Sequence, residues 1–277
     1  MADVSSSSTS HVRSSSLPSN AHPLVVTIEE QLSRLKASKE TSSSTSHRLG
    51  GLKELYERVD DLIHLPLTKQ ALGVQQLEEV LDGSLKLLDL CGIARDVFSR
   101  MRESVLALES SLRRRSGGES GLASEVRAFM VTRKELNKMI CQCLKNLKGM
   151  NQNCKLTVLE KDSEMVAVVS ILREAEEISL SVFESLLSSL SLPKPKSVVS
   201  KLLHSKREEV EATEAEKVDA ELSLIKSGKD IKLGQVQKLL KGLDSFQSTI
   251  KETEEELECV FRRLLKTRVS LLNILNN

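Results

Sequence analysis

Apolar residues recur every seven positions along the last forty or so residues of the chain. The first line of them is Val236, Leu243, Ile250, Leu257, Leu264 and Leu271. A second line lies three positions further on (Leu239, Phe246, Val260, Ile274), and a third lies four positions further on (Leu240, Phe261, Leu275). On an α-helix these lines form one broad apolar stripe, about 60 Å long over roughly 40 residues. The pattern predicts a long C-terminal helix over 234–277 that packs against other helices.

The polar interruptions of this stripe indicate what covers it. A strict two-stranded coiled coil keeps both core positions of each heptad apolar. Here the +3 position is polar in two heptads, at Thr253 and Thr267. The +4 position is polar in three, at Gln247, Glu254 and Arg268. We therefore expect the stripe to be buried by helices of the same chain rather than by self-association.

The same helical period recurs through the rest of the chain, whereas the alternation typical of strands does not. A capping box formed by Thr27 and Glu30 predicts the start of a short first helix. Asp82-Gly83-Ser84 predicts a break or kink. Further helices are expected over 47–65, 68–81, 84–113, 122–148 and 158–191. The predicted fold class is all-α: an elongated multi-helix bundle with a long C-terminal helix and a disordered N-terminal tail.

Composition changes along the chain and predicts its domain organisation. Residues 1–23 are rich in Ser and cannot bury a core, so we expect a disordered tail, and a Ser/Thr-rich linker is expected over 38–46. Residues 24–192 are expected to form the helical bundle, on which 234–277 packs. Between them, 193–233 includes the highly charged stretch 206–221, which is either an exposed helix, the favoured interpretation, or a flexible connector.

Overall composition excludes some classes of function. Aromatic residues make up 2% of the 277 residues, and the net charge is +1, so no global field attracts nucleic acid or membrane. The five cysteines are an odd, scattered set, which favours reduced thiols in an intracellular protein. No secretory signal is evident, and the longest uncharged apolar run, 165–172, is too short to span a bilayer. We expect a cytoplasmic location, with the membrane periphery and the nucleus as open alternatives.

The sequence contains no recognised catalytic, cofactor-binding or metal-binding motif. The histidines are isolated from one another. Cys141 and Cys143 are two residues apart, and such residues point to nearly opposite sides of a helix, so we interpret them as buried small residues. We predict no enzyme activity, no cofactor and no metal, and the absence of an aromatic platform speaks against nucleic-acid binding.

One short motif in the tail predicts a regulated partner. Arg13, Ser16 and Pro18 have the spacing R-S-x-S-x-P that 14-3-3 proteins read when the middle serine is phosphorylated. Phosphate on Ser16 would add nearly two negative charges and three strong acceptors for an arginine cluster. The alternative is an ordinary disordered Ser-rich tail.

A second feature is a basic helix in the middle of the chain. Residues 113–148 hold nine Lys or Arg against three Asp or Glu. Within the helix expected over 122–148, Arg127, Lys134, Lys138 and Lys145 fall on the side opposite the apolar stripe. Such a face can lie on an anionic membrane or bind a calmodulin-like partner. With Phe129 as its lone aromatic anchor, a solvated outer face is the favoured interpretation.

Several stretches resemble a plant-specific family catalogued as domain of unknown function 241, which is distantly similar to the BYPASS proteins. The stretches are 11–14 with 17–19, 22–24 leading into 29–32, LPLTKQAL at 65–72, LDGSLKLLDLC at 81–91, Arg133-Lys134, and the Leu-rich run closed by Pro193. Their order spans about residues 11–275. The resemblance implies a helical plant protein with no assigned enzymatic activity, whose relatives are associated with root and shoot development.

Together these observations predict a non-enzymatic helical protein that contacts protein partners, with 14-3-3 as one candidate through phosphorylated Ser16. The alternative is a peripheral membrane or trafficking factor that uses the basic helix 122–148.

Overall fold

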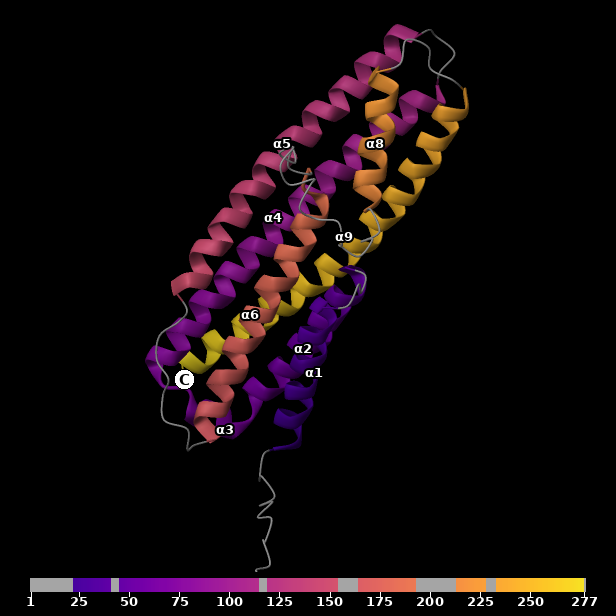
Figure 1. The fold of residues 1–277 in the computed structure, drawn as a ribbon. Helices are drawn as coiled ribbons and strands as arrows, with labels where there is room; N and C mark the ends of the chain where they lie inside the picture. The colour runs from indigo at the N-terminus through magenta and orange to yellow at the C-terminus, as the bar shows by residue number, and fades with distance from the viewer. Residues whose placement is uncertain are drawn as a thin grey trace, which may run out of the picture.

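The computed structural model describes residues 22–40, 45–114, 119–153, 164–192, 213–227 and 233–276. In these ranges every regular element is an α-helix and there is no strand, so the all-α prediction is confirmed. The helices run side by side in an elongated bundle (Figure 1). The Ser-rich tail, for which we predicted disorder, lies outside the described residues except for its last two positions.

The chain enters the bundle through α1 (Pro23–Glu40) and α2 (Thr45–His64). Helix α1 begins at Pro23, where a missing N–H costs nothing, so the predicted start at a Thr27 capping box is wrong. The Thr27 hydroxyl instead donates a hydrogen bond to the Pro23 carbonyl oxygen at 2.9 Å, one turn back inside the helix. The two helices include residues 38–40 and 45–46 of the expected linker, and 41–44 lie outside the described residues.

The next two helices divide the chain at a different place from the one predicted. Helix α3 (Pro66–Ala71) is one short turn-like segment, and α4 (Val74–Arg113) then runs without a break through Asp82-Gly83-Ser84. The break lies at Leu72-Gly73 instead. Gly83 allows α6 to approach α4 closely. A Cβ at this position would lie 2.2 Å from Oε2 of Glu176, so a residue with a side chain would clash there.

Three further helices follow: α5 (Glu119–Asn153), α6 (Glu164–Leu190) and α8 (Glu214–Ser227). Helix α8 falls in the segment 193–233 predicted as a charged connector or exposed helix, of which 193–212 and 228–232 lie outside the described residues. A capping box starts it, because the Thr213 hydroxyl and the Glu216 carboxylate each accept the other residue's backbone N–H. Ala215, Val218 and Leu222 are buried, so α8 is a packed helix rather than an exposed one.

Helix α9 (Leu233–Leu275) is the longest helix, and it lies against α2, α4 and α8. All six residues of the first heptad line are buried, and so are Thr253 and Thr267, the two polar residues of the second line. Ion pairs and hydrogen bonds fasten its sides: Lys266 reaches Asp60 of α2 at 2.8 Å, and Arg268 reaches Ser84 of α4 at 2.9 Å. The stripe is therefore buried by helices of the same chain.

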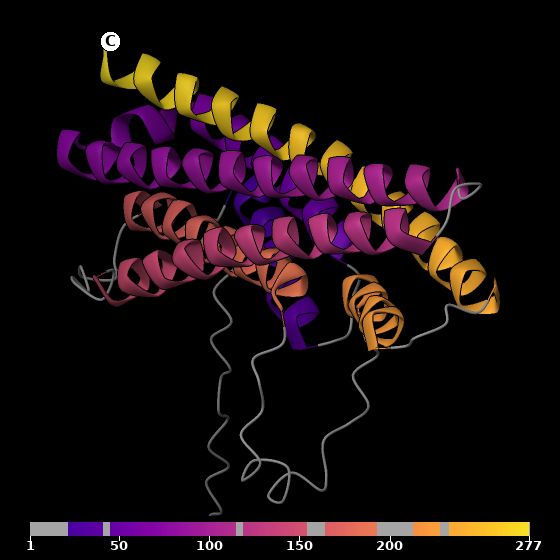
Figure 2. The ribbon, with the colours of Figure 1, turned by 90° about the horizontal axis from the view of Figure 1, so that it is seen from above.

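Buried apolar residues of α1, α2, α4, α5, α6, α8 and α9 form one connected cluster. Seen from above in Figure 2, α9 lies beside α4 along one side of the bundle, and α5 and α6 lie on the other. This arrangement decides which faces of α5 and α9 remain open to solvent.

Candidate functional site

The outer face of α5 carries the basic residues that the sequence singled out. Arg127, Lys134, Lys138 and Lys145 are all exposed. From Arg127 to Lys145 is 18 residues, which is five helical turns and about 27 Å at 3.6 residues per turn. Lys134 and Lys138 depart from the line joining the first and last by only about 20° each at 100° per residue. The four cations, which we call the α5 ridge, therefore stand in a straight single file.

The packing of α5 points this ridge directly away from the core. Val126, Phe129, Leu136, Ile140 and Leu147 are buried against the bundle, on the opposite side of the helix. Helix α5 forms one long edge of the molecule (Figure 1). The ridge therefore projects into solvent along this edge.

The charges of the ridge are not used inside the described part of the chain. Within the described ranges, no ion pair joins any of the four cations to an acid, whereas Arg100 on the neighbouring α4 pairs with Asp96. Glu135 is exposed to the side of the ridge, and Val131, 51% exposed, is the one large exposed apolar residue among the described side chains of α5. A surface of this kind attracts an anionic partner without anchoring it in an apolar pocket.

A fifth cation of α5 lies on the opposite face and was not recognised from the sequence as a buried group. Arg133 is 1% exposed. Its guanidinium donates to both carboxylate oxygens of Asp219 on α8, at 2.9 to 3.2 Å, and to the carbonyl oxygen of Leu190 at the end of α6. One turn further along, Asn137 accepts the Leu192 backbone N–H at 2.8 Å. Arg133 thus joins α5, α6 and α8.

Burial perturbs the acid of this ion pair. It raises the pKa of the Asp219 carboxyl above its usual value, although the charge and hydrogen bonds of Arg133 act in the opposite direction. A signal for this pair existed in the sequence: Arg133 stands between Phe129 and Leu136, at positions where α5 faces the core. Because every polar atom here is engaged with protein, the pair is a structural clamp rather than a reactive site.

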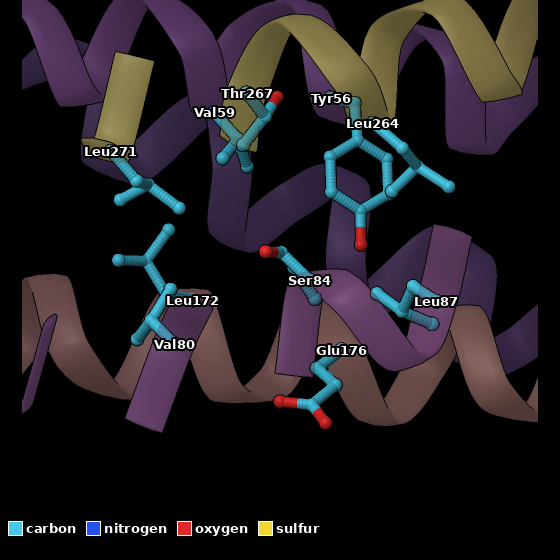
Figure 3. Close-up of a pocket in the computed structure, with 11 residues that line it drawn as sticks. Tyr56, Val59, Val80, Ser84, Leu87, Leu172, Glu176, Leu264, Thr267 and Leu271 are labelled. Atoms are coloured by element: carbon cyan, nitrogen blue, oxygen red, sulfur yellow. The ribbon is translucent and has the colours of Figure 1, made fainter. Parts of the chain in front are cut away.

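A small cavity of about 30 Å³ lies where α2, α4, α6 and α9 meet (Figure 3). Val59, Val80, Leu87, Leu172, Leu264 and Leu271 supply most of its wall. The Tyr56 hydroxyl points into the space between the helices (Figure 3), and it lies 2.9 Å from the Ser179 hydroxyl. Burial raises the pKa of Tyr56 well above its usual value, so the phenol stays neutral.

The size and the lining of this cavity are those of a packing defect rather than of a substrate site. A volume near 30 Å³ holds about two water molecules, whereas ligand pockets measure roughly 300 Å³ or more. The buried hydroxyl of Thr267 lacks a hydrogen-bond partner among the described residues. Burial raises the pKa of Glu176, but its carboxylate lies over Gly83 and points away from the cavity (Figure 3). No base faces a nucleophile here.

Two of the cysteines are buried in the bundle, and burial changes their chemistry. Burial raises the pKa of Cys91 to about 12 and that of Cys143 above its usual value, so both remain thiols near neutral pH. Cys143 is buried while Cys141 is partly exposed, and Cys154 lies outside the described residues. Across the described ranges no three His, Cys, Asp or Glu side chains are grouped so that they could hold a metal ion.

The candidate phosphorylation motif of Arg13, Ser16 and Pro18 lies outside the described residues. The structure therefore neither brings it to the α5 ridge nor separates it from the ridge. Among the described helices, none has the length and hydrophobicity needed to cross a bilayer.

Comparison with known proteins gives one match. The family model described as "Protein BPS1" matches residues 48–274, which run from the first turn of α2 to the last turn of α9. The match confirms the resemblance inferred from the sequence. Neither the curated proteins nor the solved structures contain a match to this chain.

Proposed function

The chain belongs to the BPS1 family, and from that premise we propose that it is a non-enzymatic plant protein that acts by binding a protein partner through exposed helical surfaces. The observation that carries the proposal is the α5 ridge, whose four cations project from the bundle and have no acidic partner in the described ranges.

The shape of the ridge favours a protein with an acidic edge. The cations form a single file about 27 Å long, which matches the length of an acidic helix or strand edge lying along α5. Of the α5 side chains that the structure describes, Val131 is the one large exposed apolar residue on this face, so we expect the contact to be mainly electrostatic. Such contacts give fast, salt-sensitive association.

The test is a pull-down from plant tissue with the full chain and with a variant in which Arg127, Lys134, Lys138 and Lys145 are replaced by Gln. We expect the partner proteins to be lost from the variant and from wild type at raised salt. The control for net charge replaces four exposed lysines elsewhere (Lys36, Lys238, Lys241 and Lys251), three of which pair with acids of their own chain. Equal capture by the ridge variant and the control would reject the α5 ridge as the partner surface.

A specific observation also favours a second function, that of a peripheral membrane or trafficking factor. The ridge points straight away from the core, so α5 could lie flat on an anionic bilayer, with roughly 1 kcal/mol of attraction for each of the cations. Co-sedimentation with vesicles containing phosphatidylserine tests this. Binding that the ridge variant loses and the control variant retains would favour the membrane function, and no binding by wild type would exclude it.

Regulation through the N-terminal tail is a separate part of the proposal. Phosphorylation of Ser16, with Arg13 and Pro18 at the required offsets, would create a 14-3-3 site. A phosphopeptide of residues 10–22 should bind 14-3-3 much more tightly than its unphosphorylated form. The full chain with Ser16→Ala should not be captured after kinase treatment, and equal binding of both peptides would end this part of the proposal.

The biological setting that accords with the family is plant development. Relatives that share the resemblance are associated with root and shoot growth, and a protein that binds partners without catalysis suits a regulatory role there. Complementation of a loss-of-function plant with the ridge variant tests the connection. Full rescue of growth by the ridge variant would show that the developmental role does not need the α5 ridge.

A further inference from the structure

Arg48, in the first turn of α2, is a buried cation. Its side chain is 6% exposed, and its Nε atom lies in the interior without a hydrogen-bond partner among the described residues. Within the described ranges no carboxylate forms an ion pair with its guanidinium, and burial alone lowers the pKa of Arg48. Burying a charge without compensation is strongly unfavourable, so buried charges in proteins are normally paired. A negative group beside Arg48 would therefore be stabilised.

Contacts between α1 and α2 engage the acid that follows Arg48 along the helix. The two helices lie against each other (Figure 1), and Gly51, one turn after Arg48, lies against the side chain of Leu35. Glu54 is the first acid of α2 after Arg48, and it accepts a hydrogen bond from Nε2 of Gln31 at 3.1 Å. This carboxylate is therefore held by α1, six residues away from Arg48.

The first turn of α2 adds two features that favour an anion on the same side. The first N–H groups of a helix have no partner within it and form the positive end of its dipole. Side chains on a helix lean toward its N-terminus, so Arg48 leans back over the first turn. Thr45 opens α2 three residues earlier, on the same face, and its side chain is half-buried. Ser46 is two residues before Arg48 and points to nearly the opposite side.

We propose that Thr45 is a phosphorylation site and that Arg48 binds its phosphate at the N-terminus of α2. A protein kinase would form the bond between Oγ1 of Thr45 and the γ-phosphorus of ATP. The bond from that phosphorus to the β–γ bridging oxygen breaks, ADP leaves, and the hydroxyl proton is released to solvent. The product carries nearly two negative charges where the helix dipole favours them.

The chemistry of the two groups is complementary. A guanidinium offers paired N–H donors that fit two phosphate oxygens, and such charge-assisted hydrogen bonds are strong. The hydroxyl belongs to the chain itself, so no further ligand has to be recruited to compensate Arg48. Phosphorylation would therefore strengthen the start of α2, where this helix packs on α1. The site is independent of the α5 ridge and of Ser16.

Phosphoserine encoded at position 45 of the full chain tests the site, with phosphoserine encoded at position 46 as the matched control. Both place the same charge at the same helix end, but only position 45 shares a face with Arg48. The chain modified at 45 should melt about 2 °C or more above the chain modified at 46. In the Arg48→Met background, or in Arg48→Gln if the former fails to fold, the two should melt together. Equal melting temperatures with Arg48 present would overturn the proposal.

Phosphorus NMR reads the contact itself. The guanidinium favours the dianion, so the phosphate at position 45 should titrate at lower pH than the phosphate at 46, and Arg48→Met should remove the difference. Inorganic phosphate added to the unmodified chain distinguishes a free anion from a covalent one. Stabilisation by inorganic phosphate that needs Arg48, with none from phosphorylation at 45, would overturn the proposal. Phosphopeptide mapping of the protein from plant tissue under phosphatase inhibition should find phosphate on Thr45, and its absence there would overturn the modification.

Discussion

Helices α5 and α9 each carry the same kind of side chain at two neighbouring positions, one of them buried in the bundle and the other exposed to solvent. On α5, Arg133 is 1% exposed and clamped to α8, while the next residue, Lys134, is exposed on the ridge. On α9, Leu264 is 1% exposed, while the next residue, Leu265, is 47% exposed. A shift of one residue turns a side chain by about 100° around the helix.

This comparison separates stability from binding within single helices. Substitutions on the inner faces remove packing or strand a buried charge, so they should act on the free energy of unfolding. Substitutions on the outer faces should leave that free energy nearly unchanged and act on association instead. Matched substitutions on the two faces of one helix can break or sharpen this separation.

The largest effect is expected on the inner face of α9. Leu257 is fully buried, so Leu257→Asp places an unpaired charge in the core and should cost several kcal/mol of stability, enough to unfold the domain. Leu265→Asp makes the same change on the outer face and should cost about 0.5 kcal/mol or less. Urea denaturation followed by circular dichroism measures both. If Leu257→Asp stayed folded and only dissociated a dimer, the heptad line would be an oligomer interface.

The inner face of α5 should give the next largest effect. Arg133→Met leaves the Asp219 carboxylate buried without its partner and should lower the free energy of unfolding by about 3 kcal/mol or more. Lys134→Met, the neighbouring control on the ridge, should change it by about 0.5 kcal/mol or less. The double variant Arg133→Met/Asp219→Leu should recover much of the loss. A double variant as unstable as the sum of the two single variants would show that the ion pair is not coupled.

A smaller effect of opposite sign is expected at Glu176 on α6. Burial raises the pKa of this carboxyl in the folded state, so the folded protein resists its ionised form. Glu176→Gln should therefore stabilise the protein near neutral pH. The advantage should shrink as the pH falls through the raised folded pKa and vanish below the unfolded pKa, because wild type is then protonated in both states. Chemical denaturation at several pH values measures it, with Glu177→Gln as the exposed control.

The smallest effect on stability is expected for the α5 ridge. Replacing all four of its cations by Gln removes no ion pair or hydrogen bond to the described residues, so the melting temperature should stay close to that of wild type. Differential scanning calorimetry checks this at low salt. A large loss of stability would mean that the ridge pairs with acids of its own chain. The proposal that the ridge binds a partner would then be rejected.

The sequence predicted the elements better than their boundaries. The 3.6-residue period of α2, α5, α6 and α9 is a local property, so these helices could be predicted without any knowledge of their neighbours. The break near Gly83 was misplaced because glycine has two uses, as a helix breaker and as a space for a neighbouring helix. Nothing local to Gly83 distinguishes these uses, because the choice depends on Glu176, which is 93 residues away in the chain.

The candidate site, too, has one part that the sequence predicted and another that only the tertiary structure revealed. Helical spacing alone placed Arg127, Lys134, Lys138 and Lys145 on one side of α5, because four residues on one helix share a phase whatever surrounds them. That Arg133 is buried and paired with Asp219 required the docking of α8, and that Leu265 is exposed required the bundle to cover one side of α9 and leave the other open. The sequence by itself determined the helices and the lines of residues along them, since these follow from local hydrogen bonding and periodicity. The tertiary structure alone decided which line is buried, because burial depends on segments that are distant in the sequence.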